Sequence, residues 1–146
     1  MASVGLPDGV LVTARSFGSP RTRLPPDYGV YLCARRARRR HARAWTGTWR
    51  ARWLDWPPLG VPRDSAAAVD ALREAHQRAA RGERVEIACG SGRSRTGTAL
   101  AALAVRTGLD ADEAVTWVRH NYPPASVITR RQRQWLASVT PALRRI

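Results

Sequence analysis

Cys89 and Arg95 are separated by five residues, a spacing that puts a thiol and a guanidinium at the two ends of one short loop. Backbone N–H groups in such a loop can bind an anion, and an arginine can bind two oxygens of a phosphate. Near this positive charge we expect the thiol to be held as a nucleophilic thiolate, with the Thr96 hydroxyl donating a proton to the sulfur. These residue types indicate phosphoryl transfer through a cysteine. The loop residues that we expect to bind the phosphate are Gly90, Ser91, Gly92, Arg93, Ser94 and Arg95.

The loop lies between a predicted buried strand and a predicted buried helix. Residues 85–88 form an apolar, partly β-branched run of the strand type. From Thr96 onward the chain is apolar on all sides, as is typical of a helix inside a domain. A helix that begins at the loop adds its amino-terminal dipole to the anion site. The alternative is a surface turn with a buried cysteine, but the order strand, loop, helix favours a catalytic loop.

The run from Ala88 to Thr96 resembles the signature loop of the cysteine-dependent protein tyrosine and dual-specificity phosphatases, whose usual form is His-Cys-x-Ala-Gly-x-Gly-Arg-Thr. Cys89, Gly92, Arg95 and Thr96 match this pattern, whereas Ala88 replaces the histidine. The resemblance extends over residues 53–136. It implies the α/β fold of that family, a three-layer sandwich in which helices flank a central, mostly parallel sheet.

The resemblance also implies a reaction. Cys89 would form a phosphocysteine, while Arg95 and the loop amides bind the phosphate of a phosphorylated substrate, by family default a phosphotyrosine protein. No metal and no cofactor are implied. We therefore expect a phosphomonoester hydrolase.

A second segment, residues 55–62, resembles the mobile loop Trp-Pro-Asp-x-Gly-x-Pro, whose aspartic acid protonates the leaving oxygen in that family. In the closest alignment the acid position is Pro58, which cannot donate a proton. Asp55 is then the best remaining acid, and a structural role at a strand end is its alternative. Asp64 precedes a helical run, so we expect it to be a helix N-cap. A general acid contributes about 10²–10⁴-fold in rate, so a catalytically weak phosphatase, or a module that binds phosphoproteins or phosphoinositides, is the alternative function.

The motif Thr129-x-x-Gln132-x-x-Trp135 resembles the family segment Thr-x-x-Gln-x-x-Phe, on a helix expected over residues 129–137. The resemblance implies that Gln132 helps to place the water that hydrolyses the phosphocysteine. A solvated glutamine on a helix surface is the alternative.

The remaining pattern predicts strands at residues 10–14 and 28–34, a strand or bent ribbon within 45–56, and helices over 64–81 and from Asp110. We expect a single domain over residues 1–146, with 1–27 irregular or peripheral. Cys33 is expected to be a small buried hydrophobe, with pairing to Cys89 under oxidation as the alternative.

The formal net charge is +14, and all 25 basic residues are arginine. The absence of lysine, together with abundant alanine, suggests GC-rich codons and a bacterial source. Arg35–Arg43 is expected to be a solvated loop. Its alternatives are a basic rim that attracts phosphorylated partners, or a nucleic-acid contact in an RNA-end phosphatase or RNA-binding protein.

No apolar run of about 18 residues predicts a membrane span, and no signal peptide is evident. A reducing cytoplasm suits a thiolate enzyme. The sequence does not indicate an oligomeric state.

Overall fold

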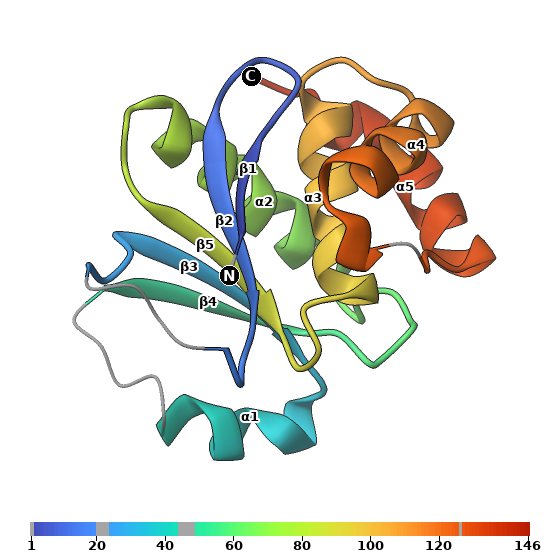
Figure 1. Cartoon of the computed structure of the whole chain (residues 1–146). Helices are drawn as coiled ribbons and strands as arrows, with labels where there is room; N and C mark the ends of the chain where they lie inside the picture. Colours follow the sequence, from blue (N-terminus) through green and yellow to red (C-terminus); the bar gives the residue numbers. More distant parts are fainter. Residues whose placement is uncertain (1, 20–23, 44–48, 126) are drawn as a thin grey trace.

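The computed structural model describes residues 2–19, 24–43, 49–125 and 127–146. Three strands begin the described part of the chain, strands and helices alternate from β3 to α3, and helices end it (Figure 1). In chain order the elements are β1 Ala2–Gly5, β2 Leu11–Ser16, β3 Tyr28–Cys33, α1 Arg35–Arg43, β4 Arg50–Asp55, α2 Ser65–Ala80, β5 Val85–Cys89, α3 Ser94–Arg106, α4 Ala111–Asn121, the 3-10 turn η1 Pro123–Ala125 and α5 Arg130–Leu143.

The five strands form one mixed sheet in the order β1-β2-β5-β3-β4. Strands β2, β5, β3 and β4 are parallel, and only β1, at the edge, is antiparallel to its neighbour. The last residue of β5, Cys89, pairs with Ser16 of β2 and Leu32 of β3. Ligand crevices of parallel sheets lie beyond the carboxyl ends of the strands, and this is where Cys89 lies.

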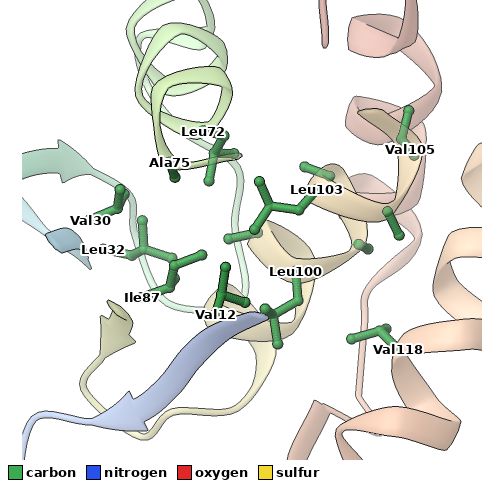
Figure 2. Packing of buried hydrophobic residues seen from close by; sticks show 14 of the residues in the cluster. Val12, Val30, Leu32, Leu72, Ala75, Ile87, Leu100, Leu103, Val105 and Val118 are labelled. Carbon is green, nitrogen blue, oxygen red and sulfur yellow. The ribbon is translucent and has the colours of Figure 1, made fainter. Parts of the chain in front are cut away.

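Helices α2 and α3 pack on one face of the sheet, α4 and α5 pack against these two helices on the same side, and the main core runs through these contacts. Figure 2 shows side chains of the central strands pointing at side chains of α2 and α3. The residues in this contact region include Val12, Val30, Leu32, Ile87, Leu72, Ala75, Leu100 and Leu103. Every residue of α3 from Ala99 to Val105 is fully buried, which explains why this helix is apolar on all sides.

Helix α1 packs on the opposite face of the sheet, against β4 (Figure 1). A small second cluster lies on that face, where Tyr31 and Ala88 pack with Phe17, Trp49 and Trp53. Helices therefore lie on both faces, and the predicted three-layer α/β sandwich with a mostly parallel sheet is confirmed.

The expectation that Arg35–Arg43 is a solvated loop is wrong, because these residues form helix α1. The run contains no glycine or proline, and arginine has a high helix propensity. Ala37 and His41 are partly buried, whereas the arginines between them are exposed. Because so few of its residues are apolar, this helix has the same composition as a charged loop, and the sequence pattern does not distinguish the two.

The amino-terminal part, expected to be irregular or peripheral, contributes β1 and β2 to the sheet. The strand predicted within residues 45–56 is β4, and residues 44–48 of that stretch lie outside the described residues. Asp64 is the N-cap of α2, as predicted, and its carboxylate accepts the Ala67 N–H at 3.0 Å. Helix α5 begins after Thr129, as predicted, but continues to Leu143. In the described part of the chain no helix is long and apolar enough to cross a membrane.

Gly97 lies where α3 meets η1, and a Cβ at this position would overlap the Cβ of Ala125. We expect Gly97→Ala to lower the free energy of unfolding, since overpacking costs about 1–3 kcal/mol and the helix-propensity gain of alanine is only about 1 kcal/mol. Urea unfolding measures this change. Gly18→Ala is the control, because a Cβ there meets no atom within 4 Å. Equal stability of both variants would contradict this account of the packing.

Candidate active site

The loop after β5 folds back on the Cys89 side chain. The Cys89 sulfur accepts hydrogen bonds from the Gly92 N–H at 3.1 Å and from the Thr96 hydroxyl at 3.0 Å, and the residue is fully buried. The turn requires Gly92, whose φ is 67° and where a Cβ would meet the backbone of Arg15 and Ser16. Two donors on one sulfur stabilise negative charge there.

Arg95 lies in the first turn of α3, which begins at Ser94, two residues before the predicted start. Its Nη1 donates to the Trp56 carbonyl at 3.0 Å, and its Nη2 is so near Gly90 that a Cβ there would lie 3.2 Å from it. The guanidinium is thus held beside the first residue of the loop. The structure therefore brings together Cys89, Arg95 and Thr96, as the sequence predicts.

The segment that follows β4 forms a closed turn beside this loop. The indole N–H of Trp56 donates to the Gly60 carbonyl at 2.7 Å, and the Gly60 N–H donates to the Pro57 carbonyl at 3.0 Å. Pro58 is exposed at the tip of the turn. The position expected for an acid by alignment therefore carries no proton donor.

Gln132 is fully buried and joins three segments. Its Oε1 accepts from the Ser94 hydroxyl at 2.8 Å and from the Thr129 N–H at 2.9 Å, while its Nε2 donates to the Gly60 carbonyl at 2.9 Å. The alternative of a solvated surface glutamine is wrong. Gln132 fastens the turn at Gly60 and the start of α3 to the beginning of α5.

Asp55, the last residue of β4, lies two strands away from β5 in the sheet. Its carboxylate accepts the Arg35 N–H at 3.0 Å and lies 3.4 Å from the Arg63 Nε. About a third of the side chain is exposed. The partners of Asp55 thus belong to α1 and to the segment before α2, rather than to the loop of Cys89.

Tyr122 is a site residue that the sequence analysis missed. Its hydroxyl donates to the Gly92 carbonyl, and burial, with a contribution from Cys89, raises the pKa of Tyr122 to about 12. The phenol therefore stays protonated and remains a donor at neutral pH. Because N–H and C=O point in opposite directions in a trans peptide, this bond directs the N–H of Arg93 away from Tyr122. Tyr122 and Gly92 are 30 residues apart in the sequence. Their contact in the folded structure identifies Tyr122 as a site residue, and no local motif does.

Two further side chains near the loop come from the sheet face that α1 covers. The rings of Phe17 and His41 lie 4.5 Å apart, and the Phe17 N–H donates to the Cys89 carbonyl at 2.9 Å. Burial lowers the pKa of His41, and the charges of Arg40 and Arg95 lower it further, so the imidazole is neutral at neutral pH. His41 therefore acts as an aromatic packing group here.

Cys33, at the end of β3, is a free buried thiol. Burial raises its pKa, although Arg95 and Arg38 act in the opposite direction. Cys33 is therefore a neutral thiol, which agrees with its expected role as a small buried hydrophobe.

The sequence profile of the protein-tyrosine phosphatase family matches residues 34–137. No curated protein sequence matches the chain. Among solved structures, the chain is similar to Tk-PTP in the active form, at 25% identity and a TM-score of 0.59, covering 83% of this chain and 80% of that one. It is also similar to P. aeruginosa TpbA, at 25% identity and a TM-score of 0.56, covering 84% and 73%.

The Yvh1 phosphatase domain from Chaetomium thermophilum has 18% identity and a TM-score of 0.65, over 97% of this chain and 96% of that one. At this identity the likeness concerns the fold. The five-stranded mixed sheet with flanking helices is therefore shared over nearly the whole chain.

The bond between Tyr122 and Gly92 predicts that Tyr122→Phe weakens anion binding by the loop. One buried hydrogen bond contributes about 0.5–1.5 kcal/mol, so we expect the dissociation constants of inorganic phosphate and of vanadate to rise about twofold to tenfold. Isothermal titration measures both constants.

Tyr28→Phe is the matched control, since the buried Tyr28 hydroxyl donates to the Ala71 carbonyl of α2 at 3.0 Å. We expect it to lose stability without losing anion affinity. If both variants bind phosphate as tightly as the wild type, Tyr122 does not orient the loop.

Proposed function

The chain belongs to the protein-tyrosine phosphatase family, and on that premise we propose that its cysteine-dependent phosphatase activity proceeds through a phosphocysteine on Cys89. The observation that carries this proposal is the Cys89 sulfur with two hydrogen-bond donors, inside a loop that ends at the amino terminus of α3. Helix dipole, loop amides and Arg95 together suit a phosphate dianion.

In the first step the Cys89 thiolate attacks phosphorus, and the bond from phosphorus to the ester oxygen breaks. Arg95 and the loop amides stabilise the equatorial oxygens, whose charge is spread in the transition state. The guanidinium is already held near the loop by the Trp56 carbonyl. Little side-chain rearrangement is then needed when substrate arrives.

The leaving oxygen needs a proton, and we assign its donation to Asp55. Two observations support this assignment: Asp55 ends β4 at the carboxyl edge of the sheet, the edge at which β5 ends in Cys89, and its ion-pair partner Arg63 is largely exposed. Exchanging Arg63 for substrate is therefore a small rearrangement, because exposed ion pairs contribute only about 0–1 kcal/mol.

In the second step water attacks the phosphocysteine and the bond from sulfur to phosphorus breaks. Thr96 stabilises the departing thiolate through its hydroxyl, which already donates to the sulfur. We assign Gln132 to the placement of the water. An amide nitrogen carries two N–H groups, and the bond to Gly60 uses one of them, so the second can bind the water.

We propose phosphotyrosine proteins as the substrates, in keeping with the description of the matched family. We also propose that the protein acts in the cytoplasm, because both described cysteines are free and a reducing compartment keeps a nucleophilic thiol from being oxidised.

Replacement of the nucleophile tests the proposed reaction. We expect Cys89→Ser to reduce hydrolysis of p-nitrophenyl phosphate by at least about 10³-fold, because serine lacks a comparable anionic form. Cys33→Ser is the control and should retain most of the activity. The reaction should be unaffected by EDTA. Equal activity of Cys89→Ser and wild type would disprove the phosphocysteine pathway.

The assignment of Asp55 predicts a dependence on the leaving group. We expect Asp55→Asn to lower kcat about 10²-fold for phenyl phosphate and much less for p-nitrophenyl phosphate, whose nitrophenolate leaves without a proton. Asparagine can still accept the Arg35 N–H, so α1 keeps this contact. Asp64→Asn, at the N-cap of α2, is the control. An equal loss of kcat with both esters would show that Asp55 has a structural role and does not donate the proton.

A further inference from the structure

The outer side of α1 consists of arginine. The side chains of Arg35, Arg36, Arg39 and Arg40 are exposed, while Ala37 and His41 face the body of the protein. In the described part of the chain none of these four guanidinium groups forms an ion pair. These positive charges are therefore uncompensated over a helix about 13 Å long.

The carboxylates of the protein lie elsewhere. Among the hydrogen bonds and ion pairs of the described residues, the one carboxylate that contacts α1 is that of Asp55, which is shared between the Arg35 N–H and Arg63. The carboxylates in the other ion pairs belong to Asp8 with His76, Asp70 with Arg52, Glu74 and Glu83 with Arg78, and Glu86 with Arg15. The positive charge of α1 is thus a local feature, in addition to the high net charge.

This surface adjoins the proposed active site. Helix α1 begins two residues after β3, the strand beside β5, and Arg38 and Arg95 both act on the Cys33 thiol. A cavity of about 520 Å³ is lined by Ala34, Arg35, Arg36, Asp55 and Arg63. Arg95 donates to the carbonyl of Trp56, the residue after Asp55, and Asp55 accepts the first N–H of α1, so α1 begins close to the arginine of the Cys89 loop.

We propose that α1 binds an acidic segment of the protein substrate, next to the phosphorylated residue whose phosphate enters the loop. This inference rests on the proposed phosphatase function and names its substrate class. Alternate residues of an extended peptide face the same way at a spacing of about 6.6 Å, close to the about 6 Å between helix residues four apart. Asp or Glu at such positions can pair with the rows Arg35–Arg39 and Arg36–Arg40.

The outer side of α1 fits other anionic partners less well. Single-stranded nucleic acid binders use exposed aromatic platforms, whereas the exposed large apolar residues of the described chain are aliphatic and lie outside α1: Leu11, Leu24, Leu59, Val127 and Ile146. Helices that insert into a membrane surface present apolar side chains outward, and α1 presents arginine. An acidic peptide needs only the charges that α1 offers.

The test compares two peptides with the same phosphotyrosine, one flanked by Asp and Glu and one by Asn and Gln. We expect wild type to have a kcat/KM about fivefold to tenfold higher for the acidic peptide at low salt, and a smaller preference at high salt. In Arg36→Gln/Arg40→Gln this preference should fall to about twofold or less, with unchanged hydrolysis of p-nitrophenyl phosphate.

The control is Arg81→Gln/Arg145→Gln, which removes the same charge from exposed positions on other elements and should keep the preference. Loss of the preference in both double variants would show an effect of net charge and overturn the proposal. Absence of the preference in wild type would also overturn it.

Binding of both peptides to Cys89→Ser, measured by fluorescence anisotropy, tests the surface without turnover. An α1-dependent preference there supports the proposal even if wild type hydrolyses no ester, a result that would defeat only the proposed function. Tighter α1-dependent binding of a single-stranded RNA oligonucleotide or of phosphatidylserine vesicles than of the acidic peptide would overturn the choice of partner.

Discussion

The Cys89 sulfur accepts hydrogen bonds from the Gly92 N–H and the Thr96 hydroxyl, and most of the surrounding structure serves to keep these three groups in place. The sulfur is delivered by the middle strand of a mixed, mostly parallel sheet, and every residue of this strand is buried. The hydroxyl is delivered by the first turn of a helix that is itself buried. The two hydrogen bonds to the buried sulfur therefore depend on a rigid strand and a rigid helix beside it.

The loop is also fastened from outside, by groups that come from distant parts of the chain. Tyr122 holds the Gly92 carbonyl, and Gln132 holds the Ser94 hydroxyl. These two bonds use a carbonyl and a hydroxyl, and neither of them uses a backbone N–H of the loop. A loop that is held rigid in this way, without use of its N–H groups, has the preorganisation that charge-stabilising sites require.

The parts of the site that could be predicted from the sequence are those whose chemistry is local. Glycine spacing, strand and helix character and the N-cap residues act over a few positions, so the loop of Cys89 and the cap at Asp64 follow from the pattern. The bond from Tyr122 could not be predicted, since it depends on how α4, whose C-cap is this residue, packs against α3. Helix α1 was misjudged because its partly buried residues, Ala37 and His41, are too few to mark an apolar stripe.

The carboxylate of Asp55 contacts both the first N–H of α1 and Arg63 in the segment before α2, so it links two elements at the carboxyl edge of the sheet. The same carboxylate that we assign to the chemistry also satisfies a backbone donor at the start of the arginine helix. If Asp55 moves towards substrate, α1 loses the acceptor of its first N–H, and a ligand that stabilises α1 in its present position would favour the present position of the carboxylate. By thermodynamic linkage the two effects would be equal in free energy, so binding on α1 and movement of Asp55 would influence each other through this one side chain.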